Sequence, residues 1–349
     1  MACLSFSAGS RMSSRLLSGF FIACAWMSST PAIALQLAEH DKIRTLIDEM
    51  VAEHGYDAGY LQSLFARVEL QPEVIAAITR PAERLPWYRY KKIFLNEARI
   101  ENGIDFWTRY ESVLRRAELE FGVPAAIIVA IIGIETNYGR ILGKYPVIES
   151  LTTLSLQYPQ RSGFFTSELK NFLLLARDEQ LPPLTVKGSY AGAIGIPQFI
   201  PSSYSAYSVD FSQNGARDLV LEVEDAIGSV ANYLHVHNWV ENGPIASDVD
   251  VSGAHVDELI ATGLSTASSV EVLTRAGVKV EGNYPGATRA NLVRLDQDEQ
   301  SYQYRAVFDN FYVITRYNTS ALYAMAVREL GLAIARKMRS RRMNTGVGG

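Results

Sequence analysis

The sequence lacks several features that define large protein classes. It has two cysteines, both within the first 34 residues, so a chain that begins after Ala34 can form no disulfide and has no thiol nucleophile. Beyond that segment no apolar run reaches the roughly 18 residues that a membrane span requires, so we expect no transmembrane span in the mature chain. The 33 basic and 37 acidic residues give a net charge of -4, without the basic excess of a nucleic-acid-binding protein. No nucleic-acid partner is therefore expected.

The N-terminal segment has the pattern of an export signal. Arg11 and Arg15 precede an apolar stretch, and Ala32-Ile33-Ala34 supplies the small residues of a cleavage site. This pattern predicts a signal peptide at residues 1–34 and a periplasmic mature protein. The alternative is lipid attachment at Cys24, which would make the protein an outer-membrane lipoprotein.

The spacing of hydrophobic residues predicts a mainly α fold. Hydrophobic residues make up 48% and charged residues 20% of the chain, which is a globular composition. Between 35 and 241, apolar residues recur every three or four positions and predict a helical body, in which we interpret the aromatic segment 85–94 as a loop. Short strand-like runs between 242 and 318, including Phe311–Thr315, predict a small α+β subdomain. Residues 319–349 are predicted to form a final helix that packs back on the body, followed by a frayed basic tail.

An apolar segment that starts at Pro124 ends in a single acidic residue, Glu135. Pro124 suits the beginning of a helix and Gly139 its end, and the apolar residues between them predict a buried helix. The apolar surroundings and the negative end of the helix dipole both favour the protonated form of a carboxyl group in the last turn. Glu135 is therefore a candidate general acid. The alternative is a solvated glutamate at a helix end, without a catalytic role.

A glycine-rich segment, 187–204, contains no acidic residue. Gly188, Gly192 and Gly195 allow the backbone of this segment to approach a ligand or a helix closely. The segment is not a phosphate-binding loop, because no Gly-Lys-Ser/Thr follows the glycines.

A short segment after residue 209 resembles the first half of an EF-hand calcium loop. Asp210, Ser212 and Asn214 have the spacing of its first oxygen ligands, and Gly215 stands at its turn glycine. The position that normally closes the loop with an acidic residue is Leu221, so a metal site would need a longer loop. An Asx turn without metal explains the same residues.

Four motifs occur in one order along the chain: IGIETNYGR, GSYAGAIGIPQFIPSSY, DAIGSVANYL and NFYVITRYNTSALYAMAV. Together they closely resemble the lytic murein transglycosylase B family, whose soluble and membrane-bound members are lysozyme-like glycosidases. The resemblance covers nearly the whole mature chain. It implies a lysozyme-like helical domain, with a small α+β subdomain inserted before the C-terminal helix. It also implies cleavage of the β-1,4 bond between N-acetylmuramic acid and N-acetylglucosamine, with a 1,6-anhydromuramyl product.

The resemblance also implies roles for individual residues. Glu135 lies in the position of the family's only catalytic acid and base, and the acid-free segment 187–204 fits a site with one carboxylate. The substrate-binding residues carried over by motif position are Ser189, Gln198, Tyr233, Tyr317, Asn318 and Tyr323, with Tyr90 and Arg161 as weaker matches. Some membrane-bound members hold calcium, which would here be bound by Asp210, Ser212, Asn214 and Asp225. No cofactor is expected for catalysis.

Two other functions remain open on the sequence. A hydrolytic muramidase on the same fold would add water to the muramyl end. A catalytically silent protein would bind peptidoglycan as a scaffold. In each case the expected partners are peptidoglycan glycan strands, with proteins of cell-wall synthesis or division as further candidates.

Overall fold

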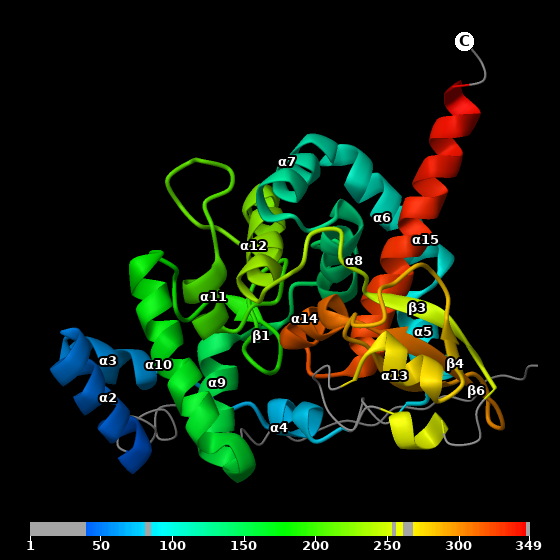
Figure 1. Cartoon of the computed structure of the whole chain (residues 1–349). Helices are drawn as coiled ribbons and strands as arrows, with labels where there is room; N and C mark the ends of the chain where they lie inside the picture. Colours follow the sequence, from blue (N-terminus) through cyan, green and yellow to red (C-terminus); the bar gives the residue numbers. More distant parts are fainter. Residues whose placement is uncertain (1–39, 81–84, 253–255, 261–267, 347–349) are drawn as a thin grey trace, which may run out of the picture.

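The computed structural model describes residues 40–80, 85–252, 256–260 and 268–346 (Figure 1). The predicted targeting segment and both cysteines lie outside the described residues. The described chain is mainly helical, as the periodicity predicts. Most helices surround one large hydrophobic core, and a small sheet lies at one side.

The helices, in chain order, are α2 (Asp41–His54), α3 (Ala58–Phe65), α4 (Pro72–Ile78), α5 (Trp87–Phe94), α6 (Glu97–Arg109), α7 (Glu111–Phe121), α8 (Ala125–Thr136), α9 (Val147–Gln157), η2 (Pro159–Arg161), α10 (Ser162–Asp178), α11 (Pro201–Tyr207), α12 (Val223–Val236), η3 (Val256–Leu259), α13 (Val270–Arg275), α14 (Asp309–Tyr317) and α15 (Ala321–Gly346). The strands are β1 (Tyr145–Pro146), β2 (Lys187–Gly188), β3 (Ala246–Val251), β4 (Val278–Val280), β5 (Asn291–Asp296) and β6 (Tyr302–Val307).

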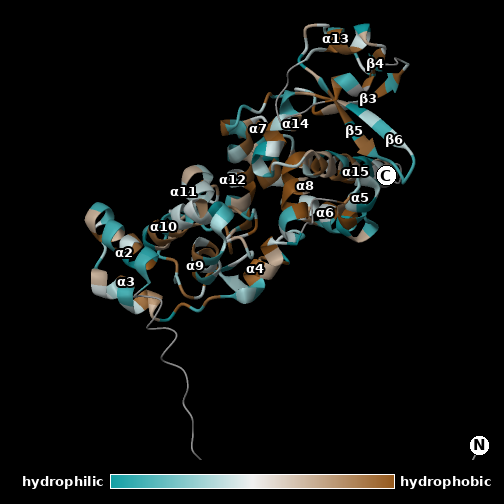
Figure 2. Ribbon diagram, turned by 90° about the horizontal axis from the view of Figure 1, so that it is seen from below, coloured by the Kyte–Doolittle hydropathy of each residue, from teal (hydrophilic) through white to brown (hydrophobic). Residues whose placement is uncertain are grey.

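Helix α8 lies at the centre of the molecule and is almost entirely buried. It is apolar on every side, in agreement with its hydrophobic colouring in Figure 2. Helices α6, α7, α12 and α15 pack around it. The helix ends at Thr136, three residues before the predicted end at Gly139. Asn137 and Tyr138 already have left-handed backbone angles, with φ of 50° and 64°. Glu135 is therefore the penultimate residue of the helix.

The N-terminal helices form a second group beside this centre. Helices α9 and α10 pack against each other along their length, and α11 packs on α10. The hairpin of α2 and α3 lies against α10 at one end of the molecule, and α4 lies on α9 (Figure 1). Leu46, Met50 and Phe65 bury the apolar faces of the hairpin in the same core as α8.

Two segments differ from the sequence prediction. The aromatic segment predicted as a loop is the helix α5, because Trp87, Lys91 and Leu95 share one helical face and Tyr90 and Phe94 share another. The run Phe311–Thr315 is helical, within α14, although aromatic and β-branched residues favour strands. Its residues are buried in the main core beside α15, and this tertiary burial outweighs the intrinsic preference.

The four-stranded sheet is antiparallel, with strand order β4-β3-β6-β5. In its register Leu292 pairs with Ala306, and both side chains are buried in a small core that Leu273 and Phe308 complete. Strands β5 and β6 confirm two other strand-like runs of this region, at 290–295 and 304–307. The division of the chain into domains at 242 and 318 stays a prediction. Helix α14 lies inside the predicted subdomain, yet its side chains pack into the main core.

Within the described residues no single helix is long and apolar enough to cross a membrane. The bent pair of α7 and α8 passes such a test only by length and composition, and α8 is buried in the core.

Candidate functional site

Glu135 meets Tyr323 at the end of the central helix. The Tyr323 hydroxyl, from the first turn of α15, donates a hydrogen bond of 2.5 Å to Oε1 of Glu135. The Glu135 side chain lies at the surface of the core and is half-buried, whereas Tyr323 is only 2% exposed. A polar substrate can therefore reach the carboxyl group while protein surrounds its other side.

Burial raises the pKa of Glu135 from 4.5 to about 7, and the hydrogen bond from Tyr323 partly offsets this rise. Near neutral pH the residue is thus present in both protonation states. Burial and the nearby charge of Glu135 together raise the pKa of the Tyr323 hydroxyl well above 10, so Tyr323 keeps its proton and acts as a donor. A carboxyl group with this pKa can release a proton in one step and accept one in the next.

Tyrosine rings line one side of Glu135. Tyr317, at the end of α14, lies parallel to Tyr323 with ring centroids 6.4 Å apart, and its hydroxyl donates to the carbonyl of Pro197 at 2.5 Å. Burial, followed by the charge of Glu135, raises the pKa of Tyr317. Tyr233 on α12 packs edge-on against Tyr317 at 4.9 Å and donates to the carbonyl of Arg316 at 2.6 Å. The structure thus brings three predicted tyrosines from three helices together, with Tyr323 in contact with Glu135 and Tyr233 behind Tyr317.

The glycine-rich segment folds back beside these tyrosines. The Ser189 hydroxyl accepts hydrogen bonds from the backbone N–H groups of Ala191 (3.2 Å) and Ala193 (3.0 Å). Its own proton has no acceptor among the described residues, so it can donate to a ligand. Gln198 has a left-handed backbone with φ of 52°, and its Nε2 donates to the carbonyls of Leu142 and Gly195. Its side chain therefore ties the segment to the turn that follows α8.

The remaining predicted residues differ in their positions. Tyr90 lies between Trp87 and Phe94 on α5, and its hydroxyl is close enough to Tyr323 to influence the pKa of that group. Asn318 follows α14 directly and is half-buried. Arg161 is exposed, with its guanidinium 4.2 Å from the centre of the Phe164 ring, and no contact links it to Glu135.

Comparison with known proteins assigns the chain to a family. Residues 38–332 match the family model described as "Transglycosylase SLT domain". The chain belongs to this family of lytic transglycosylases. It is 42% identical, over 308 residues, to the membrane-bound lytic murein transglycosylase B of Escherichia coli. The matched region covers 85% of this chain and 84% of the relative. As a lytic transglycosylase, the protein is a peptidoglycan-cleaving enzyme with a lysozyme-like fold.

Two solved structures of relatives extend this comparison. The Escherichia coli lytic transglycosylase Slt35 in complex with calcium superimposes with a TM-score of 0.79 at 42% identity, over 85% of this chain and 94% of that one. SltB3 from Pseudomonas aeruginosa in complex with NAG-anhNAM-pentapeptide superimposes with a TM-score of 0.73 at 30% identity, over 82% and 77% of the two chains.

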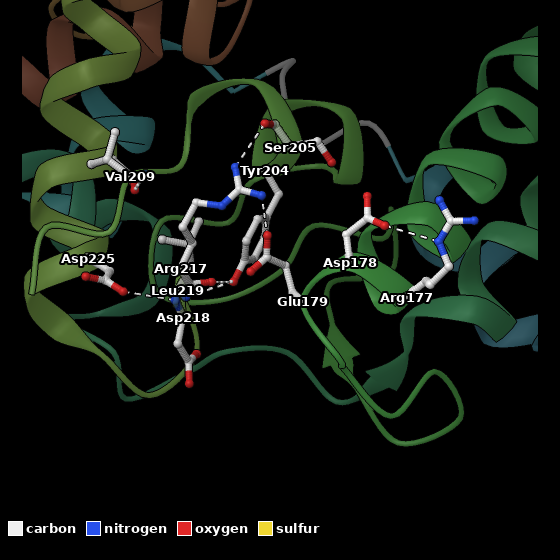
Figure 3. Close-up of polar contacts among 11 residues, drawn as sticks. Arg177, Asp178, Glu179, Tyr204, Ser205, Val209, Arg217, Asp218, Leu219 and Asp225 are labelled. Carbon is white, nitrogen blue, oxygen red and sulfur yellow. Dashed lines mark hydrogen bonds and ion pairs between the residues drawn. The ribbon is translucent and has the colours of Figure 1, made fainter. Parts of the chain in front are cut away.

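The EF-hand-like loop of this transglycosylase closes through two aspartates. Asp210 accepts hydrogen bonds from the backbone N–H groups of Asn214 and Gly215, and from the Ser212 hydroxyl at 3.3 Å. The fully buried Asp225, at the start of α12, accepts from the N–H groups of Ser212 (2.7 Å) and Asp218 (2.9 Å), the latter drawn in Figure 3. The described residues contain no group of three or more His, Cys, Asp or Glu side chains placed to hold a metal ion.

Sequence reasoning did not single out two residues of the site. Phe199 packs against Tyr233 at 5.5 Å and Tyr317 at 5.7 Å, and so supports both rings. Tyr207 packs edge-on against Tyr233 at 4.9 Å. Both lie in or next to the glycine-rich motif, and their aromatic character among small residues was the available signal.

Proposed function

We propose that Glu135 acts alone, first as acid and then as base, and that the transglycosylase forms 1,6-anhydromuramyl ends without water. In the first step the protonated carboxyl group gives its proton to the glycosidic oxygen as the C1–O4 bond breaks. The N-acetylglucosamine fragment leaves as an alcohol, and the Glu135 carboxylate faces the positive charge that develops at C1. The acetamido group of the substrate can share in stabilising C1.

In the second step the muramyl O6 hydroxyl attacks C1, and Glu135 accepts the hydroxyl proton. The new C1–O6 bond closes the anhydro ring, and Glu135 is protonated again for the next cycle. No atom of water enters the product. A pKa of about 7 suits both steps, because a carboxyl group far below this value would lack the proton for the first.

The observation that supports this mechanism is the isolation of Glu135 from other acids. Among the described residues, Glu135 is the only carboxylate whose charge acts on the hydroxyls of Tyr317 and Tyr323. A hydrolysing glycosidase uses a second carboxylate about 5–10 Å from the first to form a covalent intermediate or to activate water. The NAG-anhNAM-pentapeptide held by SltB3 supports an anhydro product for this chain as well.

Digestion of purified sacculi in heavy-oxygen water tests the proposal. Transfer to O6 incorporates no oxygen from the solvent, so the muramyl ends are expected to carry none of the label. Label at muramyl C1 would instead identify a hydrolytic muramidase. Binding to sacculi without any soluble fragment would indicate a silent scaffold.

The proposed substrate contacts follow from the ring arrangement. The partly exposed rings of Tyr317 and Tyr90 suit stacking against pyranose rings, while the free proton of Ser189 suits the acetamido carbonyl. Tyr233 is 7% exposed and stacks on His237 at 4.2 Å, so we assign it to holding the Tyr317 ring in place. We assign Gln198 and Asn318 to the same glycan groove, where they would bind sugar hydroxyl groups. Arg161, whose guanidinium lies against the Phe164 ring, would meet a carboxylate farther along the strand.

The rate of glycan cleavage should fall as pH rises through about 7, because the first step needs protonated Glu135. The hydrogen bond from Tyr323 stabilises the ionised carboxylate and therefore lowers this pKa. In Tyr323→Phe the falling limb of the pH–rate profile, where the rate declines with rising pH, is expected to move to higher pH by about one unit. The control is Tyr317→Phe, which loses a bond to a backbone carbonyl instead and should move the limb less. A limb that stays in place in Tyr323→Phe contradicts this role.

We infer that calcium binds weakly in the loop around Asp210. Its candidate donors, Asp210, Ser212, Asn214 and Asp225, are all oxygen donors, which suits a hard cation. The buried Asp225 has no cationic side chain within ion-pair distance among the described residues. Leu221, 77% exposed at the usual closing position, supplies no ligand, so we expect a low affinity.

Calcium titration followed by thermal unfolding tests this inference. Calcium at about millimolar concentration is expected to raise the unfolding midpoint of the wild type, because an ion that binds only the folded state stabilises it. Asp225→Asn should abolish the increase. Its amide nitrogen replaces one of the two oxygens that accept backbone N–H groups, so its calcium-free midpoint should also be lower, and the increase is measured from the calcium-free midpoint of each protein. An unchanged unfolding midpoint of the wild type in calcium would contradict calcium binding in this loop.

The export pattern supports a periplasmic location for the mature enzyme, at its glycan substrate. Mass spectrometry of the mature N-terminus distinguishes the two routes. A chain that begins at Leu35 supports cleavage by a signal peptidase, whereas a lipid-modified Cys24 supports an outer-membrane lipoprotein.

A further inference from the structure

The last turn of α8 is also held by an arginine on the neighbouring helix α6. Arg99, in the first turn of α6, donates from its guanidinium to the carbonyl oxygen of Gly133, two residues before Glu135. The same carbonyl accepts the N–H of Asn137, which closes the helix. The guanidinium lies 5.4 Å from the centre of the Phe94 ring, and Asn96 caps the backbone N–H of Arg99. A cation is thus fixed at the negative end of the central helix.

Tyr138 completes this support. Its backbone is left-handed, its hydroxyl donates to the carbonyl of Arg99 at 2.9 Å, and its ring lies against Gly133 and Gly103. A Cβ at Gly133 would be 2.6 Å from the ring, and one at Gly103 would be 2.5 Å from the Tyr138 hydroxyl. Both glycines therefore permit a contact that any larger residue would disrupt. The side chain and the backbone of Arg99 are both engaged with the segment that carries Glu135.

We propose that Arg99 is a positioning residue for the reaction, whose cation fixes the last turn of α8 and offsets the negative helix end beside Glu135. The proposal rests on the proposed role of Glu135 as acid and base. Burial lowers the pKa of Arg99, yet a guanidinium keeps its charge at every pH at which the enzyme folds. A cation at a helix C-terminus opposes the dipole that would otherwise favour the protonated carboxyl group.

Few other groups face Glu135. The Tyr323 hydroxyl donates to its carboxylate, Tyr317 lies within reach of its charge, and Tyr90 faces Tyr323 from α5. Arg140, beyond the left-handed turn, is exposed and acts on Tyr138. Among the described residues, Arg99 is the cation whose hydrogen bond reaches the backbone of α8.

The test is Arg99→Gln, measured as a pH–rate profile with kcat and KM determined separately. Loss of the cation is expected to raise the pKa of Glu135 and so to move the falling limb to higher pH by about half a unit. Loss of the fixed turn should lower kcat about tenfold and leave KM within twofold, because the glycan contacts remain in place. Arg99→Lys keeps the charge without the guanidinium geometry, so its limb should return to the wild-type position while kcat recovers only in part.

Arg116→Gln is the matched control. Arg116 also donates to a backbone carbonyl, that of Phe211, and its guanidinium lies 3.9 Å from the centre of that ring, but it supports a different loop. Arg116→Gln should lower the unfolding midpoint without moving the falling limb of the pH–rate profile. If Arg99→Gln leaves the limb in place, or if Arg99→Lys gives the same limb as Arg99→Gln, the proposal is wrong. If the wild type shows no limb near pH 7, the proposed role of Glu135 fails instead.

Discussion

Glu135→Gln is expected to lower the release of soluble fragments from sacculi by about a thousandfold, the middle of the range for loss of a general acid and base. Glutamine has nearly the same shape, and its amide oxygen can still accept the hydrogen bond from Tyr323. It has no acidic proton to give to the glycosidic oxygen. The fold should be unchanged, and binding to sacculi should persist.

A matched control is Glu168→Gln. Glu168 is also a buried glutamate, and it accepts the backbone N–H of Ser202 at 3.0 Å, away from the tyrosines. The glutamine oxygen can accept the same bond, so activity should stay near the wild-type level. Retention of more than a few per cent of activity in Glu135→Gln would show that another group supplies the proton.

Gly188→Ala is expected to damage both the stability and the site. A Cβ at Gly188 would lie 2.2 Å from the carbonyl oxygen of Ala193 and 2.9 Å from the Val147 side chain. The Ala193 carbonyl accepts the N–H of Ser189, so it cannot move without displacing that residue. Overpacking of this kind costs about 2–3 kcal/mol, or roughly 5 °C in the unfolding midpoint. We also expect a drop in activity of at least about tenfold, because a shift of about 1 Å in a positioned group has effects of this order.

Gly163→Ala provides the comparison for this variant. Gly163 lies in the first turn of α10, and a Cβ there would meet no atom within 4 Å. Alanine in a helix should leave the protein as stable as the wild type or more stable, by up to about 1 kcal/mol. The midpoints of the two variants, measured side by side, separate steric crowding at Gly188 from a general effect of alanine. Equal midpoints would contradict the assigned crowding.

Much of the fold follows from local patterns. The apolar run before Glu135 predicts a buried helix, and the structure confirms it as α8. The helix ends early for a tertiary reason, because the Tyr138 ring packs on Gly133 and Gly103 and holds the chain in a left-handed turn. Nothing in the residues near Tyr138 indicates this contact with α6.

The two wrong assignments have related causes. The aromatic residues of 87–94 and the β-branched residues of 311–315 favour extended structure locally, but both segments have faces that pack against α15 or the main core. Burial against another helix contributes more than the intrinsic preference of a short segment. The sequence shows the hydrophobic residues but not the surface that covers them.

The site illustrates the same limit. The sequence alone made Glu135 a candidate general acid at the end of a buried helix, with a solvated glutamate as the alternative. Its partner Tyr323 is 188 positions away along the chain, and no local pattern joins them. The family resemblance supplied Tyr323, Tyr317 and Tyr233, and the structure places their rings together. The support from Arg99 was found only in the structure, because it depends on a guanidinium that reaches from α6 to the end of α8.

The mass of the muramyl products released from sacculi, by the wild type and by Glu135→Gln, reports both the reaction and the residue that performs it. We expect wild-type products that are lighter by one water than those of a hydrolytic muramidase, and almost no product from Glu135→Gln. Products that carry the added water, or anhydro products formed by Glu135→Gln at the wild-type rate, would contradict the proposed mechanism.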